Sequence, residues 1–400
     1  MLIKDMKKAI VISAGPLGLG IIRSLGKEGI KSIVIYENDY EAGIYSKYCV
    51  EKARVKSYLE KENILNILLE NKDKWKGLLI IPGNDESLGA LSYYKKELQE
   101  HFIIYVPDFE TVKKIINKKE MLTLAKEMNM PMPKSYFPES MEDLEKIKTE
   151  ISYPCLMKPL ERHFFYAVFR TKLFRIKNYE ELKEKFELCL KNKLEVSLAE
   201  LIPGKDTNFY SFECYVTKAG EITNEFVKVK FRQTPPFFGV GRVSMSTEKK
   251  EIIPLAKEFL SKLKDFSGPA YIEFKFDERD GLYKFIEING RIIISVSLST
   301  RCGINFPHIL YSEFVDSKII KTNNYEKNIY WIQLYRDIAT TLSKAAKEEK
   351  LGFKEFIRPY LGKKVFAYES MDDPMPMIMD WKFNLRSIFP KIIKNLKTEE

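Results

Sequence analysis

Two carboxylates in strand-like runs are the side chains of this sequence with the clearest chemical meaning. Glu273 lies in the run Tyr-Ile-Glu-Phe-Lys-Phe-Asp, and Glu287 lies in Tyr-Lys-Phe-Ile-Glu-Ile-Asn-Gly-Arg, which ends at Arg291. A carboxylate in such apolar surroundings is costly to bury unless a cation or a donor compensates its charge. Asn289 adds an amide oxygen; two acids and an amide oxygen suit Mg²⁺, and a guanidinium suits a phosphate or a carboxylate. The cluster therefore indicates a magnesium site used in nucleotide chemistry.

The same pair of acids has a structural interpretation. On the solvated face of a β-hairpin, Glu273 and Glu287 would be paired with Lys275 and Lys284. For an isolated acid in a strand this is the commoner arrangement. The rest of the chain has to decide between a metal site and a solvated hairpin.

Lysines at the ends of expected elements are the candidate anion contacts. Lys158 ends the apolar run Tyr-Pro-Cys-Leu-Met and precedes a proline, so its ammonium is directed off a strand end towards an anion. Lys118 begins a helical run and is the second candidate, with a solvated role as its alternative.

Two turns rich in proline and glycine interrupt the expected strands. The first follows Glu200 and Leu201 and precedes Asp206. We interpret it as a hinge between lobes, although turn chemistry alone also explains it. The second, Gln-Thr-Pro-Pro-Phe-Phe-Gly-Val-Gly, follows Lys230 and Arg232. It is either a lid over a site or an ordinary hairpin connection.

A glycine-rich turn follows the first expected strand, residues 9–13. Gly15, Gly18 and Gly20 form this turn, and Glu37 closes the next strand. Glycines at such a place let a pyrophosphate approach a helix N-terminus, which is typical of a dinucleotide site. The spacing departs from the G-x-G-x-x-G fingerprint, and the proline after the first glycine removes an N–H donor. A tight strand-to-helix turn is therefore the favoured interpretation.

Composition narrows the function classes. The 400 residues are 45% hydrophobic and 30% charged, without an apolar run long enough to span a bilayer and without a hydrophobic leader, so we expect a cytoplasmic protein. The net charge of +10 is spread along the chain, which favours small anionic ligands and predicts no nucleic-acid partner. Five scattered cysteines indicate reduced thiols rather than a zinc site or disulfides.

The order of the expected elements divides the chain into three parts. Residues 1–110 alternate strands and helices, with a late strand expected over residues 102–106, which predicts an α/β lobe with a doubly wound parallel sheet. Residues 111–325 begin with a helical connector, 111–133, and continue as aromatic alternating strands, typical of a largely antiparallel α+β unit. Two of these strands are expected over residues 155–158 and 209–216. Residues 326–400 are expected to form a helical and irregular extension, with a helical pattern around residues 331–347.

The end of the extension is amphipathic and basic. Apolar side chains between Phe383 and Leu396 alternate with lysines and arginine, and Pro390 interrupts the pattern. Docking onto the protein itself is the favoured interpretation, and association with an anionic membrane surface is the alternative.

Taken together, the motifs resemble the ATP-grasp ligase pattern. The segments that carry the resemblance are, in chain order, Asn117-Lys118, Lys158-Pro159, Glu200-Leu-Ile-Pro-Gly204, Glu273 and Glu287-Ile-Asn289-Gly-Arg291. The resemblance covers residues 5–315, because the N-terminal lobe is similar to the lobe that precedes this catalytic unit. More narrowly, residues 230–241 and 373–376 resemble a group of ATP-dependent carboligases, or carboxylate-amine ligases.

The resemblance implies a two-lobed ATP-grasp unit that uses ATP with Mg²⁺, or with Mn²⁺ in its place. Lys118 and Lys158 would hold the α- and β-phosphates. Glu200 and the Leu201 backbone would meet the adenine, and Asp206 would reach the ribose hydroxyls. The product would be an amide or a peptide-like bond between a small carboxylate and an amine.

The resemblance also implies the catalytic groups. Arg291 and Arg232, with Lys230, would steady the transferred phosphoryl group and the acyl phosphate. A carboxylate would attack the γ-phosphate, and an amine would then capture the acyl phosphate. The metal would be coordinated by Glu273, Glu287 and Asn289.

One segment departs from the superfamily pattern. A small, glycine-rich phosphate loop often follows the residue equivalent to Lys158, whereas residues 160–170 here are bulky and aromatic and contain no glycine. How the triphosphate is covered is therefore open.

Two alternatives come from other function classes. An NAD-dependent oxidoreductase would use the glycine turn and would leave the acids near Arg291 unexplained. A non-catalytic ATP-binding sensor of the same fold would bind Mg-ATP without releasing ADP. A homodimer is common in the superfamily and is a further expectation.

Overall fold

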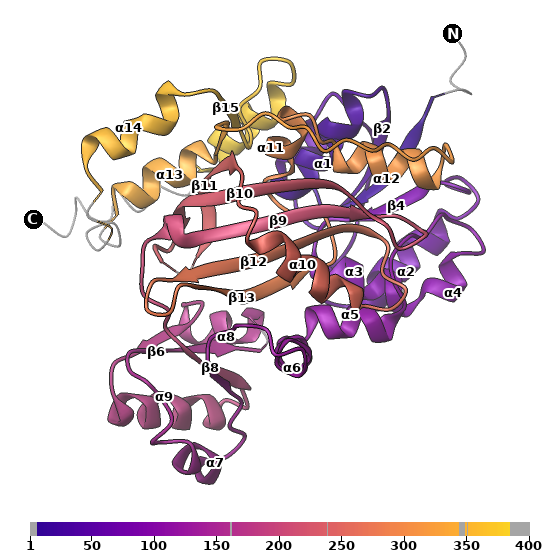
Figure 1. Cartoon of the computed structure of the whole chain (residues 1–400). Helices are drawn as coiled ribbons and strands as arrows, with labels where there is room; N and C mark the ends of the chain where they lie inside the picture. Colours follow the sequence, from indigo (N-terminus) through magenta and orange to yellow (C-terminus); the bar gives the residue numbers. More distant parts are fainter. Residues whose placement is uncertain (1–5, 161, 238, 344–348, 350, 385–400) are drawn as a thin grey trace, which may run out of the picture.

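The computed structural model describes residues 6–160, 162–237, 239–343, 349 and 351–384. It contains three β-sheets with helices packed on them (Figure 1). Within the described residues, no helix combines the length and the apolar composition that crossing a bilayer demands. The basic part of the C-terminal tail beyond residue 384 lies outside the described residues.

The N-terminal lobe is built on a four-stranded parallel sheet. The strand order is β3 (Cys49–Arg54), β2 (Lys31–Tyr36), β1 (Lys8–Ile12) and β4 (Leu79–Pro82). The connections contain α1 (Pro16–Gly26), η2 (Ala42–Tyr45) and α2 (Lys61–Glu70), and α3 (Asp85–Tyr93) and α4 (Lys95–Leu98) follow β4. The run Phe102–Val106 resembled a strand, but it forms only an isolated bridge between Leu79 and Ile103.

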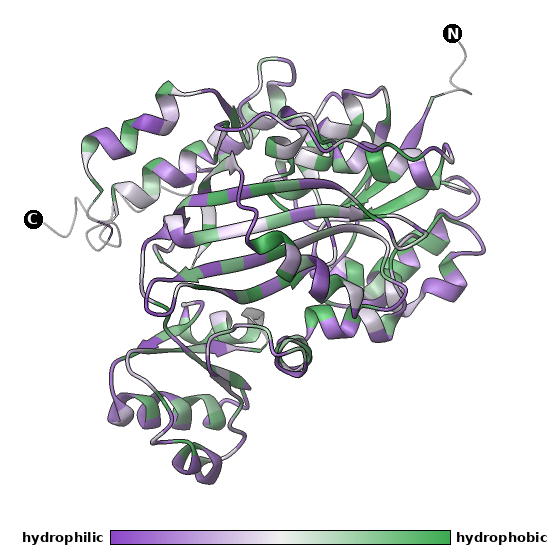
Figure 2. Cartoon of the chain, viewed as in Figure 1, coloured by the Kyte–Doolittle hydropathy of each residue, from purple (hydrophilic) through white to green (hydrophobic). Residues whose placement is uncertain are grey.

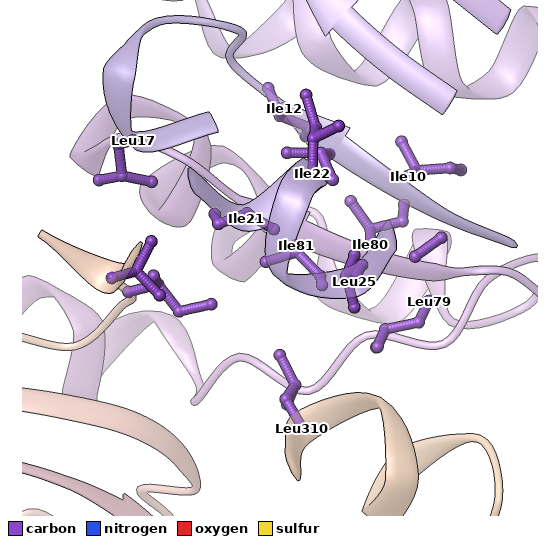
Figure 3. Packing of buried hydrophobic residues seen from close by; sticks show 14 of the residues in the cluster. Ile10, Ile12, Leu17, Ile21, Ile22, Leu25, Leu79, Ile80, Ile81 and Leu310 are labelled. Carbon is purple, nitrogen blue, oxygen red and sulfur yellow. The ribbon is translucent and has the colours of Figure 1, made fainter. Parts of the chain in front are cut away.

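The core of this lobe is aliphatic and is shared with a distant segment of the chain. Ile10 of β1 pairs in register with Ile33 of β2 and Ile80 of β4. Figure 3 shows these strands against Ile21, Ile22 and Leu25 of α1, and Leu310 belongs to the same hydrophobic cluster. Leu310 belongs to α12 (Phe306–Phe314), which follows α11 (Val296–Arg301). These two helices fasten the N-terminal lobe to the rest of the molecule.

A second, antiparallel sheet forms a small lobe after the connector helices α5 (Phe109–Ile116) and α6 (Lys118–Glu127). Its order is β5 (Ser135–Tyr136), β8 (Val196–Glu200), β6 (Cys155–Pro159) and β7 (Phe174–Ile176). The helices of this lobe are α7 (Met141–Lys146), α8 (Arg162–Phe169) and α9 (Tyr179–Lys191). Cys155 and Met157 of β6 pack with residues of α7, α8 and α9, which leaves Lys158 on the other face of the sheet.

The central sheet has seven strands, and one of its faces is apolar. The strand order is β13 (Leu282–Asn289), β12 (Gly268–Asp277), β9 (Phe209–Val216), β10 (Ile222–Thr234), β11 (Val240–Thr247), β14 (Tyr330–Ile332) and β15 (Lys364–Phe366). The helix α10 (Ile252–Ser261) covers this face, in front of the sheet in Figure 1, through Phe259 against Phe274 and Phe285. In Figure 2 green and purple residues alternate along these strands, as expected for a sheet whose faces differ.

The C-terminal extension adds two strands that the sequence pattern did not predict. Trp331, expected in a helical pattern, lies in β14 and pairs with Ser244 of β11. The helices α13 (Leu334–Thr341) and α14 (Phe353–Leu361) follow β14, and residues 375–384 are helical. Tyr330–Ile332 are fully enclosed, aromatic and β-branched, so sheet packing determines their conformation.

Candidate active site

The second face of the central sheet is buried and yet carries charged side chains. Glu213, Lys228, Lys230, Glu273 and Lys275 are between 3% and 8% exposed. They stand at alternate positions of β9, β10 and β12, whereas the residues between them belong to the apolar face. We call this surface the polar face. The alternation explains why each acid sits between apolar neighbours in the sequence.

Glu273 and Glu287 lie directly opposite each other in the β12–β13 register. Asn289, two residues further on, points its amide nitrogen at Glu287 Oε1 at 3.5 Å. Glu273 is fully engaged in this structure. Lys230 Nζ lies 2.7 Å from its Oε1, and the hydroxyl of Tyr271 donates to the same oxygen at 2.5 Å. Burial, followed by the charges of the two glutamates, raises the pKa of Tyr271 well above its ordinary value, so it stays a donor.

The chemistry of this donor set suits Mg²⁺ better than a transition metal. Among the described residues, no group of three or more His, Cys, Asp or Glu side chains forms a metal cluster. Two carboxylates and an amide oxygen are a small set of hard ligands, and Mg²⁺ completes such a set with water and phosphate oxygens. Glu273, Glu287 and Asn289 therefore fit a magnesium ion that a nucleotide brings with it.

Arg291 joins this cluster to the N-terminal lobe. Its Nε donates to Asp85 Oδ1 at 2.7 Å, and its Nη2 donates to Asn289 Oδ1 at 3.3 Å. Asp85 begins α3, directly after the carboxyl end of β4. The guanidinium thus lies between the candidate metal ligands and an acid of another lobe. Asp85 was missed at the sequence level, although Asn-Asp-Glu after a buried strand marks a strand end where ligands are often bound.

Sequence reasoning named Lys275 only in the alternative interpretation, as an ion-pair partner of the two acids on a solvated hairpin. Lys275 lies on the polar face two residues after Glu273, and its Nζ donates to the backbone oxygen of Ile202 at 2.7 Å. Burial is the main cause that lowers its pKa to about 8; the carboxylate of Asp206 opposes the shift, and the ammonium of Lys158 adds to it. Lys158 of the small lobe and Lys275 of the central sheet therefore lie close enough to repel each other. The period-two spacing from Glu273 is the signal that could have revealed Lys275.

The segment after β8 connects the small lobe to the central sheet. Glu200 accepts a bond from Arg279 Nη1 at 2.7 Å and from the backbone N–H of Lys134 at 3.2 Å. Leu201 and Ile202 follow, and the latter supplies the carbonyl that Lys275 holds. These contacts place Glu200 and Leu201 at the junction of two lobes, as a hinge requires.

Asp206 begins η3 (Asp206–Asn208) and holds the proline-rich loop after β10. Its oxygens accept the backbone N–H of Gln233 at 2.9 Å, the Gln233 side chain at 2.8 Å and the backbone N–H of Phe237 at 3.1 Å. Burial raises the pKa of Asp206, although the bonds from Gln233 oppose this. In this structure the carboxylate therefore fixes the start of the candidate lid.

The structure places Arg232 in a different neighbourhood from Lys230. The ladder between β10 and β11 shifts register between these two residues. All three guanidinium nitrogens of Arg232 are engaged by the C-terminal extension: Nε and Nη2 donate to Asp337 at 2.8 and 2.6 Å, and Nη1 donates to two carbonyls of α14. Lys118, by contrast, is half-buried at the first position of α6, after the N-cap Asn117.

The glycine turn of the N-terminal lobe is used for packing. A Cβ on Gly18 would stand 1.9 Å from the backbone oxygen of Ser13, and one on Gly20 would stand 2.5 Å from Val296. The N–H of Ala14 is taken by Glu41 Oε2 at 2.6 Å. A carboxylate at the strand end repels a pyrophosphate, which argues against a dinucleotide site here.

The sequence of this chain is similar to the sequences of two enzymes of known activity. No protein-family model matches the chain. It is 25% identical over 359 residues to the D-aspartate ligase of Enterococcus faecium, covering 85% of this chain and 84% of that protein. It is 24% identical to a formate-dependent phosphoribosylglycinamide formyltransferase of Sulfurisphaera tokodaii, covering 66% of this chain and 64% of that one.

Solved structures agree on the fold. The L-amino acid ligase from Bacillus licheniformis superposes with a TM-score of 0.60 at 18% identity, covering 77% of this chain and 74% of that chain. The ADP complex of an N5-carboxyaminoimidazole ribonucleotide synthetase gives a TM-score of 0.65 at 16% identity, covering 86% of both chains. The resemblance in fold that the motifs indicated is confirmed.

Proposed function

We infer that this chain, which belongs to the ATP-grasp superfamily, is a Mg-ATP-dependent ligase that joins a carboxylate to an amine through an acyl phosphate. The observation that carries the proposal is the polar face, where Glu273 and Glu287 stand opposite each other beside Asn289. Lys230 is paired with Glu273, and Arg291 donates to Asn289. Buried acids and cations in this arrangement match the charges of a metal-bound triphosphate.

The residue roles follow from position. Glu273, Glu287 and Asn289 would hold the metal, which when bound neutralises the β- and γ-phosphates. Lys158 approaches from the small lobe and would contact the phosphates. Lys118, at the start of α6, would do the same.

The base and the ribose would lie at the hinge. Glu200 and the backbone of Leu201 are placed at the lobe junction, where they would meet the adenine. Asp206 would reach the ribose hydroxyls once the Gln233 loop moves, since that loop now uses both carboxylate oxygens.

In this reaction the protein would mainly position the substrates and neutralise the charge on the phosphoryl oxygens, without forming a covalent intermediate itself. An oxygen of the substrate carboxylate attacks the γ-phosphorus, the bond to the bridging oxygen breaks and ADP leaves. The amine then attacks the acyl carbon and inorganic phosphate leaves, while the amine loses a proton. Arg291 and Lys230 are positioned to stabilise the phosphoryl oxygens during both steps. Arg232 would act indirectly, because Asp337 and α14 hold its guanidinium.

The relatives suggest the class of substrate. Two of them are named for amino acids, D-aspartate in one and L-amino acids in the other. We therefore propose an amino acid as one of the two substrates, with bicarbonate as the nearest alternative acid. A homodimer in the cytoplasm is the proposed state of the protein.

The first test compares ligands by thermal shift. ADP with Mg²⁺ should raise the melting temperature of the wild type, EDTA should remove most of the effect, and Glu287→Ala should abolish the metal-dependent part. Mixtures of amino acids and amines are then screened for ADP release. Stabilisation by NAD that EDTA does not change would instead support the oxidoreductase. Nucleotide binding without ADP release from any acid and amine pair would support the sensor.

A further inference from the structure

The segment after Lys158 offers a polyphosphate fewer backbone donors than a glycine-rich phosphate loop would. Residues 162–169 form the helix α8. In a helix, the N–H groups beyond the first turn are bonded to carbonyls of the same helix. Only the N–H groups of the first turn of α8 are therefore free for phosphate oxygens, and those of the later turns are already bonded. A polyphosphate would gain from a further positive group elsewhere in the site.

The polar face provides such a group. Lys230 and Lys275 both point at Phe209: their ammonium groups lie 4.9 and 4.7 Å from the centre of its ring. Two ammonium groups of the polar face thus lie close to one ring, and Lys230 is already paired with Glu273 at 2.7 Å.

The acids nearest to Lys275 are committed to other partners. Asp206 is bonded to Gln233 and Phe237. Asp277 is bonded to Arg279 Nε at 2.8 Å and Nη2 at 2.6 Å. Lys275 itself is 4% exposed, and the partner that the structure gives its ammonium is a neutral carbonyl of Ile202. A buried ammonium held by a neutral group gains strongly from an added anion.

We propose that Lys275 is a contact for the nucleotide polyphosphate, which takes the place of the donors that a glycine-rich loop would provide. Without nucleotide, Lys275 holds the hinge carbonyl of Ile202. With nucleotide bound, its ammonium turns to the phosphate oxygens. Nucleotide binding and the release of the hinge are thereby coupled at a single side chain. This inference rests on the proposed function, since it concerns the same nucleotide site.

The test uses one variant, one conservative variant and one control. Lys275→Met keeps the length and removes the charge, and Lys275→Arg keeps the charge. Lys257→Met removes an equal charge from α10, on the opposite face, where Lys257 pairs with Glu225 at 2.6 Å. Titration calorimetry measures the affinity of each protein for ADP, ATP and adenosine with Mg²⁺. Ligand-free melting curves show whether each variant is folded.

The expected result separates phosphate contact from base contact. Lys275→Met should weaken ADP and ATP binding by about tenfold to a hundredfold, the scale of one lost charge-assisted hydrogen bond. Adenosine binding should stay at the wild-type level. Lys275→Arg should lose less than Lys275→Met, and Lys257→Met should bind all three ligands normally.

Other outcomes overturn the inference or the premise, and they can be told apart. If Lys275→Met weakens adenosine as much as ADP, the side chain serves the base or the hinge and the inference is wrong. If the folded variant binds ADP as tightly as wild type, it is wrong as well. If the wild type binds none of the nucleotides, the proposed ligase function fails before Lys275 is tested.

Discussion

At the scale of single residues, the polar face is a set of compensated charges. Lys228 lies 2.9 Å from Glu213, and its ammonium also donates to Ser295 Oγ at 2.5 Å. Burial raises the pKa of Glu213 and lowers that of Lys228, while each partner opposes the other's shift. A face that buries this many ions is costly for stability alone, since apolar residues of similar volume are often as stabilising. The proposed binding role would account for their presence.

Glu287→Ala and Lys158→Ala should each abolish ATP turnover. The first removes a proposed metal ligand and the second a proposed phosphate contact, so each should lower turnover by roughly a hundredfold or more. Steady-state ADP release measures the effect. Neither side chain belongs to the apolar clusters, so far-ultraviolet circular dichroism and the melting curve should stay close to wild type. Near-normal turnover in both variants would refute the site assignment.

Sequence reasoning found the residues whose type conflicts with their surroundings. Glu273 and Glu287 were recognisable because acids in apolar strands need an explanation. Lys275 was overlooked because a nearby acid offered a simple ion pair, and sequence does not show that Lys230 takes that acid instead. The partners of Arg232 are 105 residues away or more in the chain, and no local pattern predicts such a contact.

At the scale of elements, the strands whose residues alternate were the predictable ones. The strand expected over Phe209–Val216 has these bounds in the structure, and the one over Cys155–Lys158 is one residue longer. Tyr330–Ile332 was not predictable, because a run of three residues shows no period. The run Phe102–Val106 has strand-like composition but forms only a bridge. Composition indicates what a segment can form, and its neighbours decide what it does form.

The variant Arg232→Met tests whether Arg232 takes part in catalysis or instead binds the C-terminal extension to β10. Removing a buried partner costs about 3–5 kcal/mol when the remaining charge is uncompensated. Asp337 keeps Arg242 at 2.8 Å and the Tyr360 hydroxyl at 2.6 Å, so we expect the lower end of that range. Urea unfolding measures it. ATP turnover per folded molecule should fall much less than in Lys230→Met; equal losses would restore a catalytic role for Arg232.

We predict that the glycines in the turn between β1 and α1 differ in how much their replacement by alanine lowers stability. Gly18→Ala should destabilise the fold by about 1–3 kcal/mol, because its Cβ would overlap the backbone oxygen of Ser13. Gly15→Ala is the matched control, since its Cβ would stand 3.9 Å from the nearest atom, the Ser13 hydroxyl, and its φ of −65° suits alanine. Denaturant unfolding of the two variants should therefore differ. Equal stability, with impaired ligand binding in both, would point to a ligand at the turn.

At the scale of the whole molecule, the two ends of the described chain are tied together through the N-terminal lobe. Arg23 of α1 is 8% exposed, and its Nε donates to Asp373 Oδ2 at 2.9 Å. Ser46 and the backbone N–H of Lys47 donate to the same carboxylate at 2.7 and 2.9 Å. Phe383 packs on Tyr40 with ring centres 5.0 Å apart. The extension is thus a strap from the central sheet to the lobe that supplies Asp85 to Arg291.

The neighbouring residues Asp372 and Asp373 provide a test variant and a matched control for the strap. Asp373 is 1% exposed, and Asp373→Ala leaves the guanidinium of Arg23 buried with only backbone carbonyls. We expect a loss of about 3–5 kcal/mol in the free energy of unfolding, the usual result of breaking a buried ion pair. Asp372 also binds the lobe, at Lys47 and Tyr48, but its side chain is 58% exposed. Asp372→Ala should therefore change stability only slightly.

The strap matters for function if it holds the lobes at the distance that Arg291 and Asp85 require. In that case Asp373→Ala should raise the KM for the acid substrate under conditions where the variant is still folded, because Asp85 would no longer be presented to Arg291. The affinity for ADP should stay unchanged, since the residues proposed to bind the nucleotide lie outside the N-terminal lobe. If Asp373→Ala is less stable but has the wild-type KM, the strap contributes to folding alone. If its affinity for ADP falls together with its affinity for the acid substrate, the strap supports the central sheet as a whole.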